Sequence, residues 1–239
     1  MRYPELQTAR LLLRPLQLAD AEQTQRLFPR WEIVRFLTAK VPWPYPEGRA
    51  LESYRESIMP AIDRGDEWHW TLRLKTAPEQ HIGVVSLYRD EWDSRGYWLG
   101  LPWQGKGLMT EAVRAVNDYW FDVLRFPVLR APKAVANTGS RRISEETGMR
   151  LIATTEREYV SGRLPAELWE ITAKEWHAVR MKEGLQGDLM PGRIVLLNGT
   201  SSAGKTTLAT ALRPALGPEF CYYASDQLAD AGFRPLGAC

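Results

Sequence analysis

The feature that most constrains this chain is a glycine-rich loop toward its C-terminal end. Gly199–Thr206 reads GTSSAGKT, follows the apolar run Arg193–Asn198 and precedes Thr207–Leu216, whose pattern predicts a helix. A strand, a loop of spacing G-x-x-x-x-G-K-T and a helix are typical of a phosphate-binding P-loop. The loop therefore predicts nucleotide binding in the last part of the chain, and the residues before it need a separate explanation.

The P-loop spacing gives each of its residues an expected task. The backbone N–H groups of Ser201–Lys205 are expected to surround phosphates, and Lys205 to reach the β and γ positions. The implied ligands are ATP and Mg²⁺, with Thr206 binding the metal only through the nucleotide. The residues assigned to nucleotide phosphates are Gly199, Ser202, Gly204, Lys205 and Thr206.

Composition excludes several classes of protein. The formal net charge is +2, and no run of Lys or Arg suggests a nucleic-acid surface. No segment has the ~18 consecutive apolar residues of a membrane span. The two cysteines, Cys221 and Cys239, cannot form a disulfide framework, which favours a reducing cytoplasm. No His or Cys spacing predicts a metal site in the protein itself.

The hydrophobic pattern before the P-loop predicts an α/β (α+β) domain. Trp68, Trp70, Leu72 and Leu74 alternate as in a strand, whereas Met109, Val113, Val116, Trp120 and Val123 have helical spacing. Further strands are expected at 11–15, 81–89, 97–100, 126–131, 149–156 and 166–172, and further helices at 18–28, 47–62, 137–147 and 174–181. Glycine and proline in Lys182–Gly192 predict a linker, so the expected organisation is a domain over 1–182, a linker over 183–192 and a second piece over 193–239.

A second glycine loop lies inside the first domain. Leu101–Ala112 reads LPWQGKGLMTEA and joins a predicted strand to a long predicted helix. Gly105 and Gly107 allow a close approach of the backbone, and the first N–H groups of the helix favour an anion such as a pyrophosphate. A plain turn explains the two glycines equally well.

Four motifs in order give this domain a family resemblance. They are TARLLLRP at 8–15, GYWLGLPWQGKGLMTEA at 96–112, ANTGSRR at 136–142 and TGM at 147–149. Together they resemble the GCN5-related N-acetyltransferases, in particular the RimJ/RimL-like branch that acetylates ribosomal-protein N-termini. The resemblance implies a mixed, twisted sheet that splays in the middle and holds acetyl-CoA in the gap. Pro102 departs from the Gln or Arg at the first position of the family's loop.

The resemblance also implies roles for individual residues. The pyrophosphate of acetyl-CoA is expected at Gln104, Gly105, Lys106, Gly107, Leu108 and Met109. A backbone N–H within Leu99–Leu101 is the candidate donor to the thioester carbonyl. Asn137 matches the family's asparagine beside the cofactor, and Ser140 is the candidate general acid. Alternatively, Asn137 only caps the helix that it opens, and Ser140 is a solvated side chain of the first turn.

No general base for an amine is evident. Carboxylates stand near predicted strand ends at Glu91, Asp93, Glu156 and Glu158, although solvated surface positions explain them too. His69 is expected to face solvent or a cleft, and His81 and His177 to be peripheral. Trp31, Trp43 and Tyr45 are expected to line an acceptor cleft, with core packing an equal alternative for Trp31.

The C-terminal piece resembles the start of the chloramphenicol phosphotransferase-like kinases. The resemblance rests on the P-loop segment and on Phe220–Leu228, where Asp226 matches an aspartate that activates the substrate hydroxyl. Asp226 alternatively caps a following helix. Only 47 residues run from Arg193 to Cys239, too few to bury a core, so we expect a fragment of a longer fusion, or a remnant, without phosphotransferase turnover.

The main functional hypothesis is an acetyl-CoA-dependent N-acetyltransferase that acts by direct attack on a primary amine of a protein N-terminus, an antibiotic or a small molecule. One alternative is a non-catalytic module that binds CoA or a nucleotide. The other is a fragment of a bifunctional acetyltransferase and small-molecule kinase. The oligomeric state is not predicted.

Overall fold

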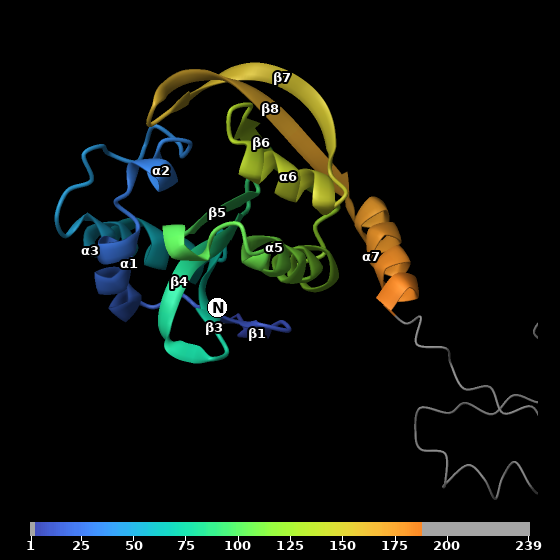
Figure 1. Cartoon of the computed structure of the whole chain (residues 1–239), viewed down its shortest axis with the longest axis horizontal. Coiled ribbons are helices and arrows are strands. Elements are labelled where there is room, and N and C mark those ends of the chain that lie inside the picture. The colour runs from blue at the N-terminus through green and yellow to red at the C-terminus, as the bar shows by residue number, and fades with distance from the viewer. Residues whose placement is uncertain (1–2, 188–239) are drawn as a thin grey trace, which may run out of the picture. The chain divides into compact units, whose positions relative to one another are not determined.

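A computed structural model describes residues 3–187 of the chain (Figure 1). The chain divides after Gln186 into two units, and the described residues belong almost entirely to the first. Its strands are β1 (Leu6–Gln7), β2 (Leu11–Pro15), β3 (Glu67–Leu74), β4 (Ala77–Tyr88), β5 (Arg95–Leu99), β6 (Val128–Ala134), β7 (Arg150–Tyr159) and β8 (Gly162–Thr172). Its α-helices are α1 (Ala21–Leu27), α2 (Trp31–Val34), α3 (Arg49–Ser53), α4 (Met59–Arg64), α5 (Leu108–Asp118), α6 (Thr138–Glu146) and α7 (Ala173–Gly187).

The strands form two antiparallel sheets that meet at β5 and β6. The first sheet has the order β1-β2-β3-β4-β5 and the second the order β6-β8-β7. The two sheets are joined near the start of β5, where the Ser94 N–H donates to the Arg130 carbonyl at 2.7 Å. No ladder continues between β5 and β6 beyond this bond in the described structure. The predicted splay in the middle of the sheet is therefore confirmed.

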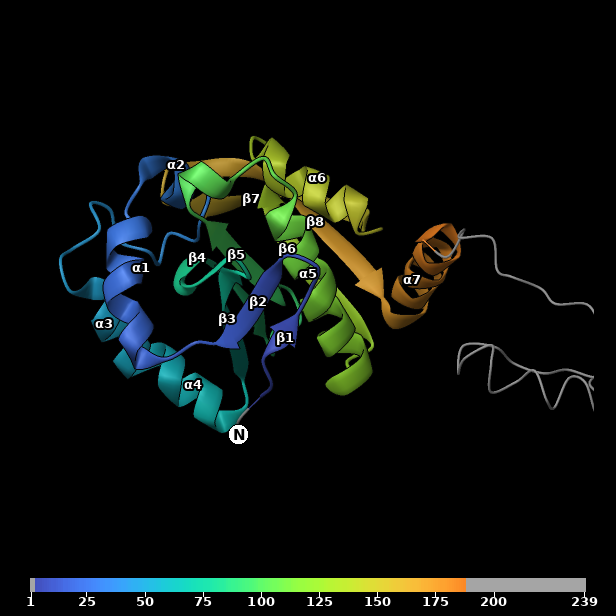
Figure 2. The ribbon, with the colours of Figure 1, turned by 60° about the horizontal axis from the view of Figure 1, so that its bottom comes forward.

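Helices cover both faces of the first sheet. Figure 2 shows α1, α3 and α4 on one side of β2–β4 and α5 on the other. Trp70, Leu72 and Val85 point toward α5 and join its buried side chains in the main core. Val84, from the opposite face of β4, packs with Tyr54 and with Leu16, Ala21 and Ala50. Because side chains along a strand alternate between the two faces of the sheet, each face packs a separate hydrophobic core.

Most predicted elements are present, with two differences in the helices. Met109, Val113, Val116 and Trp120 are buried as predicted, but Val123 is 60% exposed. A π-helical turn over Tyr119–Val123 explains this, since its wider hydrogen bonds shift the helical register. Helix α7 continues to Gly187, so the first residues of the predicted linker are helical. The predicted domain boundaries otherwise stay a prediction.

The β7–β8 hairpin reaches across the domain toward α2, as Figure 1 shows. At its tip, Val160 N–H donates to Leu37 O at 3.0 Å and Ser161 N–H to Arg35 O at 3.1 Å. The hairpin thereby ties the segment after α2 to the second sheet. These bonds close a ring of chain around the splay between β5 and β6.

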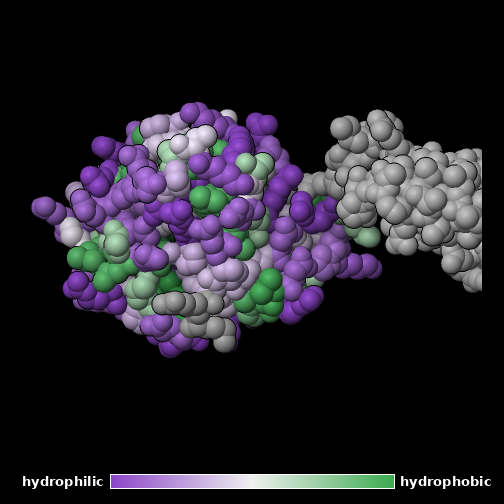
Figure 3. All heavy atoms as spheres, turned by 90° about the horizontal axis from the view of Figure 1, so that it is seen from below, coloured by the Kyte–Doolittle hydropathy of each residue, from purple (hydrophilic) through white to green (hydrophobic). Residues whose placement is uncertain are grey.

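The surface of the described part of the chain carries both hydrophilic and hydrophobic side chains. Figure 3 shows one face on which hydrophilic side chains predominate and hydrophobic ones form separate patches. None of the helices in the described part of the chain combines the length and apolarity that crossing a bilayer requires.

Candidate active site

The glycine loop after β5 ends in an uncapped helix N-terminus. Gly105 and Gly107 have φ of +72° and +71°, a conformation that glycine adopts without strain. Gly107 is the N-cap of α5 and has no side chain to bond the first turn. The first intrahelical bond runs from Glu111 N to Gly107 O, so the N–H groups of Leu108–Thr110 have no partner within the helix. This geometry suits an anion.

The loop is held from the N-terminal strands. Arg10 donates to the Lys106 carbonyl at 3.0 Å and to Glu111 at 2.6 Å, and Thr8 also donates to Glu111 at 2.5 Å. Partial burial acts to raise the pKa of Glu111, but the bonds from Thr8 and Arg10 outweigh it and hold the pKa below its usual value. The Glu111 carboxylate is thus occupied by internal donors. Arg10 places positive charge beside the helix N-terminus.

Gln104 braces the loop with its side chain. Its Nε2 donates to the Leu99 carbonyl at 2.8 Å. The side chains of Leu108 and Met109 are buried in the main core, so at those positions only the backbone can meet a ligand. The six residues predicted for a pyrophosphate thus form one short, backbone-lined cradle.

The end of β5 presents a backbone donor to the splay. The Gly100 N–H, one of three candidates from the sequence, donates to Ile82 O on β4 at 2.8 Å and is therefore not free. Successive residues of a strand direct their N–H groups to opposite sides. Because Gly100 points toward β4, the Leu99 N–H points away from β4, into the gap. Leu99 is therefore the best placed of the three.

Asn137 and Ser140 lie together at the start of α6. Asn137 Oδ1 accepts from the Ser140 N–H at 3.2 Å, so the capping interpretation of Asn137 holds geometrically. The Ser140 hydroxyl lies 2.7 Å from the hydroxyl of Tyr97 on β5. Ser140 is thereby fixed across the splay and is not simply solvated. The sequence predicts Tyr97 only as a strand residue, since nothing local relates it to Ser140.

One pocket of about 1330 Å³ runs through the splay. At its glycine-loop end it is lined by Gln104–Gly105, Gly107–Thr110 and Asn137–Ser140. At its other end, which we call the helical end, it is lined by residues of the face that α1 and α3 cover, namely Tyr54, Val84, Ser86 and Trp98. Leu99 lines the pocket too.

Two buried basic side chains, those of Arg95 and Lys133, lie beside the splay. Arg95 bonds to Asn117 Oδ1 at 2.7 Å, and its Nε has no hydrogen-bond partner. Lys133 Nζ lies 5.2 Å from the centre of the Tyr97 ring. Burial, and then Arg95, lower the pKa of Lys133 to about 7, while Asp93 opposes them. An ammonium group in this position is therefore poorly stabilised.

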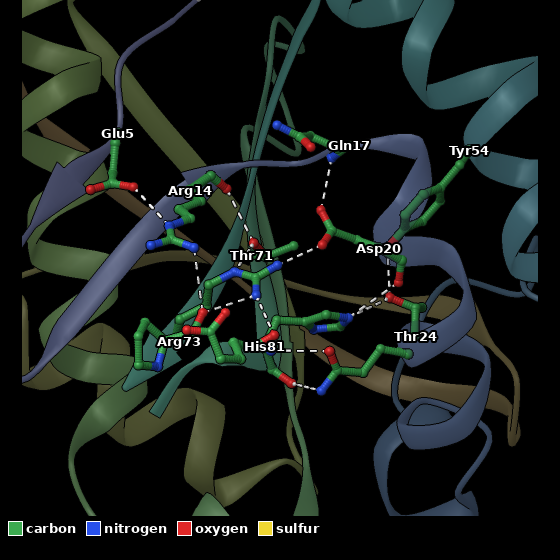
Figure 4. A network of polar contacts seen from close by, with 12 residues as sticks. Glu5, Arg14, Gln17, Asp20, Thr24, Tyr54, Thr71, Arg73 and His81 are labelled. Carbon is green, nitrogen blue, oxygen red and sulfur yellow. Dashed lines mark hydrogen bonds and ion pairs between the residues drawn. The ribbon is translucent and has the colours of Figure 1, made fainter. Parts of the chain in front are cut away.

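A buried polar network attaches α1 to the sheet at the helical end (Figure 4). Arg73 on β3 donates to Asp20 at 2.6 Å. The Thr24 hydroxyl lies 2.7 Å from Tyr54 Oη and 3.3 Å from Nε2 of His81. His81 is completely buried, so the expectation that it is peripheral was wrong. Burial lowers the pKa of His81, which favours a neutral ring that Thr24 can bond.

The predictions for the other aromatic residues and for His69 have different outcomes. Tyr45 lines the pocket and packs its ring 5.1 Å from Phe28. Trp31 and Trp43 form a pair 5.5 Å apart and are 40% and 42% exposed, outside the pocket lining. The alternative prediction that Trp31 packs in the core was therefore wrong. His69, expected to face solvent or a cleft, lines the pocket but is buried.

The four carboxylates considered as general bases differ in their position relative to the pocket. Asp93 and Glu158 line the pocket, whereas Glu91 and Glu156 do not. Burial raises the pKa of Asp93 to about 6 against the opposing charges of Arg157 and Lys133. Within residues 3–187, no group of three His, Cys, Asp or Glu side chains is arranged to hold a metal ion.

The residues predicted to act in the C-terminal piece lie outside the described part of the chain. They are the P-loop residues Gly199, Ser202, Gly204, Lys205 and Thr206, and the candidate catalytic residue Asp226.

Two family models match this chain. The model described as an acetyltransferase (GNAT) domain covers residues 10–150. The model described as a chloramphenicol phosphotransferase-like protein covers residues 192–236. The first contains the glycine loop, the end of β5 and α6, and the second contains the P-loop spacing.

Individual proteins agree with the first match. The chain is 28% identical over 153 residues to the probable N-acetyltransferase YjcK of Bacillus subtilis, covering 58% of this chain and 79% of that protein. It resembles RimL, a ribosomal L7/L12 α-N-protein acetyltransferase in complex with coenzyme A, with TM-score 0.59 and 16% identity over 71% of this chain and 96% of RimL. It also resembles a Vibrio cholerae spermidine N-acetyltransferase in complex with CoA and spermine, with TM-score 0.59 and 20% identity over 70% and 98% of the two chains.

Proposed function

The chain belongs to the GNAT acetyltransferase family, and we propose that it transfers an acetyl group from acetyl-CoA to a primary amine by direct attack. One observation carries the proposal. A single pocket connects an uncapped helix N-terminus at the glycine-loop end with the sheet face at the helical end, and the Leu99 N–H points into the gap between them. An acyl carrier and an acceptor can thus enter from opposite ends and meet in the splay.

The glycine-loop end fits the pyrophosphate of acetyl-CoA. A Cβ at Gly105 would meet no atom within 4 Å, so the space above that backbone is open. The N–H groups of Leu108–Thr110 and the charge of Arg10 supply donors and positive potential there. In this assignment the Asn137 amide group, not engaged by its cap bond through Oδ1, is a donor for the pantetheine arm.

The residues in the splay supply the expected acid chemistry. Bound acetyl-CoA would contribute the thioester carbonyl that an amine attacks. The Leu99 N–H is oriented to bond that carbonyl oxygen as negative charge develops on it. The Ser140 hydroxyl, held by Tyr97, is the proposed proton donor to the leaving sulfur. The Tyr97 hydroxyl can in turn supply Ser140 with a proton.

The acceptor is proposed only as a primary amine. The RimL protein acts on a protein N-terminus and the Vibrio cholerae relative on spermidine, so both kinds of amine are reasonable probes, together with an aminoglycoside. The helical end carries aromatic rings, among them Tyr54 and Trp98, and the pocket lining also contains carboxylates such as Asp93. These groups suit an amine that arrives as an ammonium ion.

Calorimetric titration of the chain with acetyl-CoA, followed by an assay of thiol release with those amines, tests the proposal. We expect saturable one-site binding and release of CoA that depends on an amine. Tight binding without turnover on any amine would favour a non-catalytic CoA-binding module. A folded chain that does not bind acetyl-CoA would contradict the proposal.

A second ligand is proposed for the C-terminal piece. The P-loop spacing at Gly199–Thr206 and the match of the phosphotransferase-like model support binding of ATP with Mg²⁺. Titration with ATP and Mg²⁺, repeated with Lys205→Met, tests this. Equal binding by both chains would contradict it.

A further inference from the structure

A line of hydrogen bonds joins two strands, β3 and β4, beneath the helical end of the pocket. His69 on β3 bonds through Nε2 to Glu67 Oε2 at 2.6 Å and through Nδ1 to Ser86 Oγ on β4 at 2.7 Å. His69 and Ser86 are both about 96% buried. The Glu67 side chain is 30% exposed. All three residues line the pocket, and the line ends at a carboxylate that is partly exposed to water.

When the His69 ring is neutral, the chemistry of the three groups fixes the direction of these bonds. A carboxylate only accepts, so Nε2 of His69 carries the hydrogen that Glu67 receives. In a neutral ring Nδ1 is then an acceptor, and Ser86 must donate its only hydroxyl hydrogen to it. Every hydrogen thus points along the line from Ser86 toward Glu67. The lone pairs of Ser86 Oγ remain for a donor.

Tyr88 also bonds to Ser86. Burial is the main cause that raises the pKa of Tyr88, so its hydroxyl stays protonated. When Ser86 gives its only hydrogen to His69, the Tyr88 hydroxyl is the donor in its bond to Ser86 Oγ. That hydroxyl lies over Gly96, where a Cβ would come within 2.9 Å of it. Since a hydroxyl oxygen accepts two hydrogen bonds, Ser86 has one acceptor position left after Tyr88.

The register places this position beside Gly96, near the start of β5. His69 pairs with Ser86 across β3 and β4, and Ser86 pairs with Gly96 across β4 and β5. Gly96 and Leu99 are three residues apart, about 10 Å along a strand. An amine beside the Leu99 N–H and one water molecule span that distance. Glu67, His69, Ser86 and Tyr88 all line the same pocket.

Several charged groups face this line of residues. From the segments on either side of β3 and β4 they are Asp66, Arg89, Asp90 and Asp93, which also line the pocket. Asp66 is paired with Arg64 of α4 at 2.9 Å, and Asp93 with Arg157 of β7 at 3.5 Å. No carboxylate other than Glu67 bonds His69 or Ser86 among the described residues. Asp93, near Tyr88, is the competing base.

We propose that Ser86, His69 and Glu67 form a proton relay that deprotonates the acceptor ammonium. The inference rests on the proposed acetyl transfer. The ammonium gives one proton, through a water molecule, to Ser86 Oγ while the Ser86 hydrogen passes to His69 Nδ1 and the His69 Nε2 hydrogen passes to Glu67. The amine keeps its lone pair, Glu67 becomes a carboxylic acid that releases the proton to water, and no electrons change hands. Ser86 and His69 are positioning and relay groups that do not form bonds to the acetyl group.

The first test reads the hydrogen positions without any turnover. The chain contains three histidines, so ¹⁵N-detected spectra at neutral pH, compared with those of His69→Gln, identify the His69 ring. We expect a neutral ring with hydrogen on Nε2 and an unprotonated Nδ1, and an Nε2–H signal altered in Glu67→Gln. A ring with hydrogen on Nδ1 would overturn the relay, because Ser86 would then be unable to donate.

The second test uses turnover with saturating acetyl-CoA and the best amine among spermidine, a peptide with a free N-terminus and an aminoglycoside. Ser86→Ala and His69→Gln are expected to lower kcat/KM for the amine at least tenfold and to remove the rise of kcat/KM with pH. Binding of acetyl-CoA should stay unchanged. His177→Gln is the matched control, since His177 also pairs with a carboxylate, Asp122 at 2.8 Å, but outside the pocket.

The outcomes separate the relay from the function on which it rests. If the wild-type chain transfers acetyl groups and Ser86→Ala keeps the full pH profile, the relay is wrong. If Asp93→Asn alone removes the pH-dependent rise, Asp93 is the base. If Ser86→Ala or His69→Gln is poorly folded by circular dichroism, Glu67→Gln, at the partly exposed end of the line, decides by its pH profile. A wild-type chain that binds acetyl-CoA and acetylates no amine contradicts the proposed function and, with it, the relay.

Discussion

The glycine-loop end and the helical end of the pocket are built in different ways. The glycine-loop end consists mainly of backbone supplied by one short segment, Gly100–Thr110, with the glycines in a left-handed conformation. The helical end consists of side chains from α1, β3, β4 and β5. Bonds such as Ser86–His69 and Thr24–His81 join residues 17 and 57 positions apart. A backbone site tolerates changes of side chain but not of φ, whereas a side-chain site depends on each partner.

The largest effect is expected at the helical end, which is built from side chains, when Asp20 is replaced. Asp20→Asn leaves Arg73 buried without its carboxylate, and breaking a buried pair costs about 3–5 kcal/mol of the free energy of unfolding. Since the same network reaches Tyr54 through Thr24, KM for the amine should rise too. Urea unfolding and amine kinetics measure both.

The control for Asp20 is Glu22, two residues further on in the first turn of α1. Glu22→Gln removes an exposed partner of Arg26, 3.5 Å away, and should change the free energy of unfolding by less than about 0.5 kcal/mol. Equal losses in Asp20→Asn and Glu22→Gln would show that the helical end does not depend on its buried pair.

The next largest effect is expected at the glycine-loop end, which is built from backbone, when Gly107 is replaced. A β-branched residue at φ +71° is strained by about 1–3 kcal/mol, and relief of that strain displaces the first turn of α5. Gly107→Val should therefore weaken acetyl-CoA binding at least tenfold by calorimetry. Gly65→Val is matched, because Gly65 has φ +73° at the end of α4, outside the pocket. Undiminished binding by Gly107→Val would remove the glycine loop from the site.

This difference also explains what the sequence could and could not predict. The glycine loop was predictable, since its glycines, the strand before it and the helix after it are neighbours in the chain. The burial of His81 was not, because its partners Gln23 and Thr24 lie 57 or more residues away on α1. The alternation of Trp68, His69 and Trp70 did place His69 on the face opposite the main core. Only the register of β3 and β4 reveals Ser86 beside it.

Lys133, beside the splay, provides a prediction on pH. Unfolded, its amine keeps a proton up to about pH 10.5, whereas burial and Arg95 lower the folded pKa to about 7. Between these values the unfolded chain binds more protons, so the free energy of unfolding should rise with pH, by about 1.4 kcal/mol per unit at most. Urea unfolding at pH 7, 8 and 9 measures the slope.

Lys133→Met should abolish that slope, because it removes the group that titrates. Lys75→Met, at an exposed turn, removes the same charge and should keep the slope. If the slope survives in Lys133→Met, the group that titrates lies elsewhere, and the splay tolerates a charged Lys133.

The smallest effect is expected at the contact between Tyr97 on β5 and Ser140 on α6. Tyr97→Phe removes one hydrogen bond to Ser140, worth about 0.5–1.5 kcal/mol. If Ser140 is the proton donor, kcat should fall by about threefold to tenfold, and KM for acetyl-CoA should not change. Tyr119→Phe, which removes a hydroxyl outside the pocket, is the control. A fall in kcat for Ser140→Ala without any fall for Tyr97→Phe would mean that Ser140 acts without Tyr97 holding it, and that the cap from Asn137 is sufficient to place it.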